Sequence, residues 1–304
     1  FHRLRDGGDP QPSMTARELT ALACRADKNH TAGWAHAYLD DATVNYAGLL
    51  CDRVLGGEPL AYILGEWDFY GLTFRVDKSV LIPRADTEKL CELTIEQAKP
   101  RISPRILDLC CGSGCIGIGA YLLLRGEAAL MAFGVSGCIG IAAAHEVEDA
   151  RVLAADLSDG ALRLTRENAH RLGVQNRVLV LKADATMPPP NGVGPFDIIV
   201  SNPPYITRSE MAELDHSVAD FEPHEALYGG VDGLDFYRAI CENWGETLVH
   251  GGVILFECGW KQAEDVAKIL ARYDFSDIRI AKDDAGVPRI VTGRSSREDD
   301  DLTR

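Results

Sequence analysis

The stretch Phe196-Asp197-Ile198-Ile199-Val200-Ser201-Asn202-Pro203-Pro204-Tyr205 joins a run of apolar residues to two consecutive prolines. Its apolar part is rich in β-branched residues and lies between Pro195 and Pro203, which is typical of a buried strand in a parallel sheet. Each proline fixes its own φ and favours an extended backbone in the residue before it. The sequence therefore predicts a strand that ends in a rigid corner over residues 202–205.

This corner is suited to hold a planar amino group. In open α/β sheets, ligands bind at the carboxyl ends of the strands, where the Asn202 side-chain carbonyl and the Pro203 backbone carbonyl would be fixed acceptors beside the Tyr205 ring. An amide or exocyclic amino nitrogen is a poor nucleophile, because its lone pair is delocalised. Two acceptors that hold its hydrogens can direct that lone pair at an electrophile. The alternative is an ordinary proline-rich turn after a strand.

Composition limits the classes of function. With 304 residues, 46% of them hydrophobic, the chain can bury a large core, and we expect one large and one small domain. Its apolar runs, such as 128–135, are shorter than the roughly 20 residues of a membrane span. A net charge of −15 argues against nucleic acid as a partner. Nine cysteines without a C-x-x-C pair predict reduced thiols in the cytoplasm, and the scattered histidines predict no metal site.

Changes in periodicity divide the chain into five parts. We expect residues 1–13 to be a disordered leader with little to bury. Three apolar stripes at helical spacing predict an N-terminal helical domain over 14–65, and alternating apolar residues predict a β-hairpin linker over 66–86. Residues 87–294 are expected to form the main domain, and 295–304 a flexible charged tail.

Strands alternate with helices in the main domain, which predicts a doubly wound, mostly parallel α/β sheet. The expected strands are 105–109, 151–156, 177–182, 196–201 and 252–257, with a closing pair near 278–280 and 289–291, and the expected helices are 87–99, 158–172 and 261–273.

A second ligand-binding pattern follows the first of these strands. Asp108-Leu109-Cys110-Cys111-Gly112-Ser113-Gly114 reads as a strand end and a glycine-rich turn before a helix. The glycines allow a ligand to approach the backbone closely. Asp156 ends the next strand, where an acid can hold ribose hydroxyls. Cys110 and Cys111 are interpreted as buried small residues rather than as nucleophiles.

With these features, the chain resembles the class I methyltransferases that use S-adenosylmethionine and methylate a nitrogen. More narrowly, it resembles the PrmC/HemK family of protein-glutamine N5-methyltransferases, and the resemblance covers roughly residues 15–294. Five further motifs carry it: Phe69-Tyr70-Gly71-Leu72-x-Phe74-x-Val76, Leu81-Ile82-Pro83-Arg84-x-Asp86-Thr87-Glu88, Phe221-Glu222-Pro223 with Ala226-Leu227, Glu257-x-Gly259-x-x-Gln262 and Asp284-x-Gly286-x-x-Arg289.

The resemblance implies a Rossmann-like, seven-stranded sheet and a reaction with peptide-chain release factors. Their Gly-Gly-Gln glutamine would be held by Asn202, Pro203, Pro204 and Tyr205, and the N-terminal helices would contact the factor. The residues implied to bind S-adenosylmethionine are Asp108, Cys110, Cys111, Gly112, Ser113, Gly114, Asp156, Asp184 and Asn202.

Several alternatives remain open at this point. An adenine-N6 methyltransferase of DNA or RNA would use the same corner, because adenine also offers a planar NH2 group, and a non-catalytic binding module would have lost the cofactor site. Arg84 either lines the mouth of the site and contacts substrate or pairs with Glu88 four residues on. Glu257 is either a functional acid or the cap of the following helix.

A repeated segment departs from the family pattern. Ser-Gly-Cys-Ile-Gly-Ile occurs at 113–118 and again at 136–141. Asp156 follows Gly114 by 42 residues and Gly137 by 19, whereas the usual separation is about 20. We favour the first copy as the cofactor turn, because a strand with Asp108 precedes it. Residues of about 119–141 would then be an insertion, with an extra apolar helix over 120–124 and 128–133; the rival layout makes 128–133 the strand.

Overall fold

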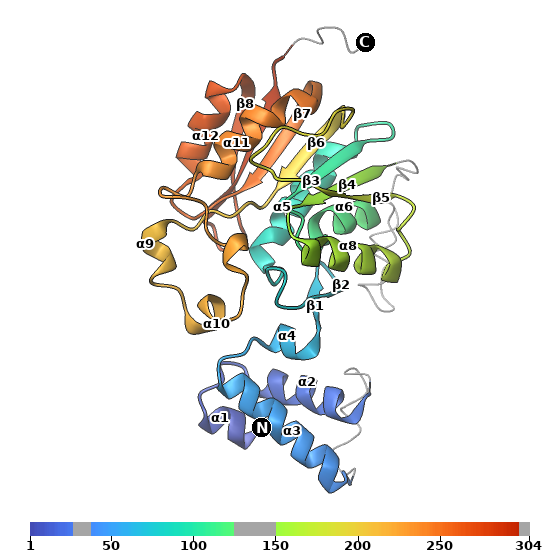
Figure 1. Ribbon diagram of the computed structural model, residues 1–304, viewed down its shortest axis with the longest axis vertical. Helices are drawn as coiled ribbons and strands as arrows, with labels where there is room; N and C mark the ends of the chain where they lie inside the picture. Colours follow the sequence, from blue (N-terminus) through green and yellow to red (C-terminus); the bar gives the residue numbers. More distant parts are fainter. Residues whose placement is uncertain (27–37, 125–149, 298–304) are drawn as a thin grey trace.

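A computed structural model describes residues 1–26, 38–124 and 150–297 (Figure 1). Its helices are α1 (His2–Asp6), α2 (Pro12–Cys24), α3 (Asp41–Leu55), α4 (Leu60–Leu64), α5 (Ala85–Ala98), α6 (Cys115–Leu124), α8 (Asp159–Arg171), α9 (Arg208–Met211), α10 (His216–Ala219), α11 (Asp235–Asn243) and α12 (Ala263–Arg272), with short 3-10 helices η2 (His224–Ala226) and η3 (Gly245–Thr247). Its strands are β1 (Glu66–Phe69), β2 (Leu72–Arg75), β3 (Arg105–Leu109), β4 (Arg151–Asp156), β5 (Val178–Lys182), β6 (Phe196–Ser201), β7 (Leu248–Glu257), β8 (Phe275–Lys282) and β9 (Pro288–Ser295).

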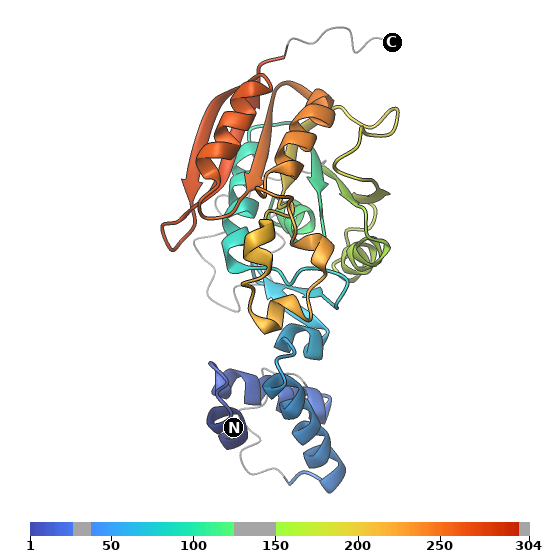
Figure 2. The same cartoon turned by 60° about the vertical axis from the view of Figure 1, so that its left-hand side comes forward.

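Seven strands form one sheet in the order β5-β4-β3-β6-β7-β9-β8. The first five run parallel, and β9 pairs antiparallel with both β7 and β8. Helices α5, α6 and α8 cover one face, and α11 and α12 cover the other (Figures 1 and 2). This is the predicted doubly wound fold. From β3 the chain runs outward through β4 to β5 and then returns to the other side of β3, where it forms β6. Open α/β sheets bind ligands at such a reversal of strand order, which here lies between β3 and β6.

Alternation along the central strands builds the two faces of the core. In β6, Ile198 and Val200 pack toward α5 and α6, whereas Ile199 packs toward α11 and α12. Both sets are fully buried, because a strand covered on both faces has no solvent side. The continuous apolar run that precedes Asn202 therefore has a direct structural cause.

The N-terminal helices form a small separate core at one end of the molecule (Figure 1). Leu4, Leu19, Leu50 and Ile63 meet in it. Residues 1–13 differ here from the expected leader: α1 lies within them, and Leu4 is 0% exposed because it closes this core. The β1–β2 hairpin follows α4, and its Phe69, Leu72 and Phe74 are buried in the core of the main domain.

Three further boundaries differ from expectation. Residues 120–124 belong to α6, which begins at Cys115, and are not a separate inserted helix. The hairpin strands end at Arg75, so residues 77–84 of the predicted hairpin segment are not in a strand. β9 continues to Ser295, which is buried. Outside the described residues lie part of one of the three predicted helical stripes, at Trp34 and Ala37, residues 128–133, the second copy at 136–141 and the end of the tail. None of the helices within the described ranges combines the length and hydropathy that a bilayer span requires.

Candidate active site

Two loops leave the sheet side by side at the carboxyl ends of neighbouring strands. β3 and β6 are parallel, and Leu109 at the end of β3 lies opposite Ser201 at the end of β6. The Ser201 hydroxyl donates a hydrogen bond to the Leu109 carbonyl over 2.7 Å. The glycine turn after β3 is therefore adjacent to the double-proline corner after β6.

A cavity of about 460 Å³ lies at this edge of the sheet, within the roughly 300–1,000 Å³ of small-molecule sites. The glycine turn, the ends of β4 and β5, and the corner supply part of its lining. Residues 79–84, which follow the hairpin, and Thr87 of α5 supply another wall. The segment between the hairpin and α5 thus forms one wall of the site.

Most of the predicted site residues line this cavity: Arg84, Cys110, Cys111, Gly112, Ser113, Asp156, Asp184, Asn202 and Pro204. Pro203 and Tyr205 are next to lining residues in the chain but do not line it themselves. Gly114 packs against α8 instead, where a Cβ would lie 2.9 Å from Thr165 Cγ2. Asp108 does not line the cavity either.

Asp108 is buried beneath the glycine turn. Its Oδ2 accepts a hydrogen bond from the Gly117 N–H over 2.9 Å, and within the described chain its Oδ1 has no hydrogen-bond partner. Burial raises the pKa of this carboxyl to about 7, against the opposite effect of the Gly117 hydrogen bond. In this structure Asp108 fastens the start of α6 and does not line the cavity.

The burial of Asp108 predicts a pH-dependent effect of Asp108→Asn on stability. A carboxyl whose folded pKa is raised from its ordinary value of 3.8 to about 7 holds its proton longer in the folded state, so the free energy of unfolding falls as pH rises between these values. Asparagine keeps an acceptor for Gly117 and removes this loss. We expect the stability of Asp108→Asn relative to the parent to rise by on the order of 2 kcal/mol between pH 5 and pH 8.

Thermal unfolding at several pH values measures this difference. Asp159→Asn is the matched control. The Asp159 side chain is 81% exposed, so this substitution should leave the pH dependence of the free energy of unfolding unchanged. Parallel curves for the parent and Asp108→Asn would show that the buried carboxyl does not titrate in this range.

Asp156 ties the glycine turn to the end of β4. Its Oδ2 accepts from the Gly112 N–H over 3.0 Å and its Oδ1 from the Ser158 N–H over 2.9 Å. Burial raises the pKa of this carboxyl, and the same backbone hydrogen bonds oppose the shift. Because both oxygens are fixed by backbone groups, the carboxylate has a defined orientation at the cavity.

Two buried residues of α8 support the same turn, and sequence reasoning did not identify them. The Thr165 hydroxyl donates to the Gly112 carbonyl over 3.0 Å, and Asn168 Nδ2 donates to the Ser113 carbonyl over 2.8 Å. Asn168 also exchanges hydrogen bonds with the Arg75 backbone at the end of β2. Their spacing of three residues places both on one helix face, but only the fold shows which loop that face meets.

Arg84 has a different partner from the one its spacing suggests. Its guanidinium pairs with the Glu222 carboxylate, whose side chain is 1% exposed. Glu88 instead accepts a hydrogen bond from the Tyr70 N–H over 2.7 Å, at the turn of the hairpin. The Arg84–Glu88 alternative is therefore wrong. Arg84 lines the cavity and joins its wall to the segment around Glu222.

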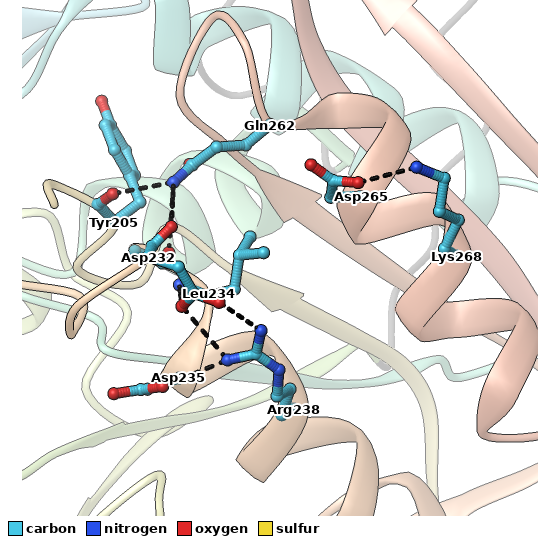
Figure 3. Close-up of polar contacts among 9 residues, drawn as sticks. Tyr205, Asp232, Leu234, Asp235, Arg238, Gln262, Asp265 and Lys268 are labelled. Carbon is cyan, nitrogen blue, oxygen red and sulfur yellow. Dashed lines mark hydrogen bonds and ion pairs between the residues drawn. The ribbon is translucent and has the colours of Figure 1, made fainter.

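A clamp holds the far end of the double-proline corner (Figure 3). Gln262 Nε2 donates to the Tyr205 carbonyl over 3.0 Å and to the Gly233 carbonyl over 3.3 Å, and its Oε1 accepts from the Gly259 N–H over 2.9 Å. An ion pair joins Asp232 of the same loop to Arg238 of α11. One side chain thus joins the corner, the loop before α11 and the loop after β7.

The comparisons with known proteins agree with this arrangement. Residues 87–216 match a family model described as RMKL-like, methyltransferase domain. The catalytic domain of hMettl16, solved with a MAT2A 3'UTR hairpin, is similar in structure with a TM-score of 0.53 and 14% identity, covering 76% of this chain and 77% of that one. At this identity the likeness shows the fold alone.

Relatives of higher identity cover most of the chain. A release factor glutamine methyltransferase of Clostridium botulinum is 39% identical over 236 residues, which are 78% of this chain and 75% of the relative. A second one, of Bradyrhizobium diazoefficiens, is 35% identical over 298 residues, which are 96% of this chain and 91% of the relative. From this identity over most of both lengths, the chain belongs to the release factor glutamine methyltransferase family.

Proposed function

We propose that this protein transfers the methyl group of S-adenosylmethionine to the side-chain amide nitrogen of the glutamine in the Gly-Gly-Gln motif of peptide-chain release factors. One observation carries the proposal: Asn202 and Pro204 of the corner line the same cavity as Gly112 and Asp156. The group that would hold the amide and the groups that would hold the cofactor therefore face one space. Release factors act during translation, which places the reaction in the cytoplasm.

The residues present fit S-adenosylmethionine. Gly112 has a φ of +55°, and a Cβ there would meet nothing within 4 Å, so the backbone of the turn is open to a ligand. The Asp156 carboxylate suits ribose hydroxyls. Asp184 accepts from the Thr186 N–H and hydroxyl through Oδ1, and it lines the cavity with Ala183 and Ala185. We infer that these groups lie near the ribose and the adenine.

The protein's own contribution is orientation. When bound, S-adenosylmethionine supplies a methyl group on a positively charged sulfur, which is already reactive toward a nucleophile. The Asn202 side-chain oxygen and the Pro203 carbonyl would accept the two hydrogens of the glutamine NH2 and direct the nitrogen lone pair at that methyl. The nitrogen becomes acidic once it carries the methyl group, so its proton can leave to water without a strong base.

A methyl-transfer assay tests the proposal. The protein is incubated with labelled S-adenosylmethionine and a release factor, beside the factor with its Gly-Gly-Gln glutamine changed to alanine. We expect label in the first factor and none in the second. Label in an adenine-containing DNA or RNA but not in the factor would support the nucleic-acid alternative, and failure to bind S-adenosylmethionine would support the non-catalytic one.

The loop before α11, which Gln262 holds through the Gly233 carbonyl, lies very close to the double-proline corner. This close approach predicts a strong effect of Gly233→Ala. A Cβ at Gly233 would lie 2.3 Å from the Tyr205 carbonyl oxygen, so the corner or the loop must shift. We expect kcat for methyl transfer to fall by on the order of tenfold or more, because small displacements of orienting groups are costly. Gly192→Ala is the matched control: Gly192 has a similar φ of +82° but nothing within 4 Å. This variant should lose about 1–2 kcal/mol of stability, because alanine is strained at positive φ, and it should keep kcat. Equal kcat for the two variants would contradict the role of the Gln262 clamp.

A further inference from the structure

Asn202 is held by a buried polar residue of α5. Its Nδ2 donates a hydrogen bond to the Thr87 hydroxyl oxygen over 3.3 Å. Thr87 belongs to the first turn of α5, and it is 3% exposed. An asparagine amide can present either its NH2 group or its carbonyl oxygen in one direction, and its hydrogen-bond partners decide which.

Glu257 is the group behind this contact. It ends β7 and is 2% exposed. Burial raises the pKa of its carboxyl, and hydrogen bonding from the side chains of Thr87 and Asn202 lowers that pKa in opposition. Within the described residues, its Oε2 has no hydrogen-bond partner. The position does not cap the following helix, since α12 begins at Ala263 after an N-cap at Gln262.

The direction of these hydrogen bonds follows from chemistry. An ionised carboxylate can only accept, so the Thr87 hydroxyl must donate to Glu257 and is left with lone pairs that accept from Asn202. On this side the Asn202 amide therefore meets acceptors, which favours its NH2 group there and turns its oxygen toward the cavity. Without the carboxylate, the Thr87 hydroxyl could donate to the Asn202 oxygen, and the amide could turn its NH2 group into the cavity instead. An NH2 group facing a substrate NH2 group cannot hold it.

We propose that Thr87 and Glu257 are positioning residues that fix the direction of the Asn202 amide, so that its oxygen, and not its nitrogen, faces the acceptor amide. The proposal rests on the proposed function, in which the Asn202 oxygen holds the glutamine NH2 group. Thr87 lines the cavity and Glu257 does not, but the proposed role of both is exerted through Asn202.

Removing only the Thr87 hydroxyl tests the proposal. We expect Thr87→Val to lower kcat by on the order of 10- to 100-fold, with the Kd for S-adenosylmethionine changed by less than about threefold, and Thr87→Ser to restore most of the rate. Thr94→Val is the matched control. Thr94 is buried on the same helix, and its hydroxyl donates to the Leu90 carbonyl over 2.8 Å, away from Asn202, so this variant should keep kcat.

A double-mutant cycle separates positioning from a general structural effect. If Thr87 acts through Asn202, adding Thr87→Val to Asn202→Ala lowers kcat no further. Full activity of Thr87→Val, or an undiminished loss from it in the Asn202→Ala background, would overturn the proposal. An inactive parent protein would instead contradict the proposed function, so the two failures can be told apart.

The pH profile gives a second readout. Burial raises the pKa of Glu257 to about 7, and Thr87, the positive charge of Arg289 and Asn202 oppose this while Asp86 adds to it. The other titratable groups around the carboxyl are Tyr205, Tyr237, Cys115 and Cys258. Protonation would let Glu257 donate and so release the fixed direction, and kcat should rise with pH through this range. Glu257→Gln, which keeps an acceptor but does not titrate, should flatten that rise; an unchanged profile would count against a role for the carboxylate.

Discussion

Replacing Asn202 with alanine is expected to lower kcat for methyl transfer by on the order of 10²- to 10³-fold, while the Kd for S-adenosylmethionine changes by less than about threefold. The variant keeps the glycine turn and Asp156, which would hold the cofactor. It loses the oxygen that would grip the substrate NH2 group and aim its lone pair. Single-turnover rates with saturating factor and cofactor measure the first quantity, and isothermal titration measures the second.

Asn176→Ala is the control for this variant. Asn176 is exposed and precedes β5, at the end of that strand away from the cavity, so its loss should change neither rate nor affinity. If Asn202→Ala weakened cofactor binding as much as it lowered the rate, Asn202 would be part of the cofactor site and would not act by orienting the amide.

Replacing Asp156 with alanine is expected to have the opposite pattern, with its main effect on cofactor binding. The carboxylate accepts from the Gly112 and Ser158 N–H groups, so its removal both loosens the glycine turn and takes away an acceptor for ribose hydroxyls. Charge-assisted hydrogen bonds of this kind are worth about 1.5–3 kcal/mol each. We expect the Kd for S-adenosylmethionine to rise by on the order of 10- to 100-fold.

Asp159→Ala controls for the loss of one negative charge in the same region. Its carboxylate is exposed and pairs with Lys182, and it does not line the cavity. Titration should give the parent affinity for this variant. An unchanged affinity in Asp156→Ala would refute the cofactor role of Asp156.

The strand and the corner could be predicted because their cause is local. Two prolines limit the backbone of their own neighbourhood, and an apolar run of this length has few other uses than a buried strand. The turn after β3 was predicted for the same reason, since Gly112 and Gly114 both adopt positive φ. Their meeting in one cavity follows from the topology of parallel sheets.

Other features depend on contacts between distant parts of the chain. Thr165 and Asn168 look like ordinary polar residues of an amphipathic helix, and only packing shows that they hold the glycine turn. Gln262 acts on Tyr205 over 57 residues. Leu4, in a short charged segment, is buried because α2 and α3 provide a core for it. No local pattern contains this information.

The repeated segment shows how strand pairing can decide where spacing misleads. Counting residues from glycine turn to acid favoured the second copy, at 136–141. In the structure, β3 pairs with β4 and places Leu109 opposite Ala155, so the first copy follows the strand beside Asp156. The Cys111 N–H donates to the Ala155 carbonyl over 3.1 Å, and this bond joins the first copy's turn to the end of β4. The second copy lies outside the described residues.

The most direct test of the account is the structure of the protein with S-adenosylhomocysteine and a peptide that contains Gly-Gly-Gln. The account predicts that the glutamine Nε2 lies at hydrogen-bond distance, about 2.7–3.2 Å, from both the Asn202 side-chain oxygen and the Pro203 carbonyl oxygen, with the cofactor sulfur on the other side of that nitrogen. A glutamine bound away from the corner, or an Asn202 amide that presents its NH2 group to the peptide, would contradict it.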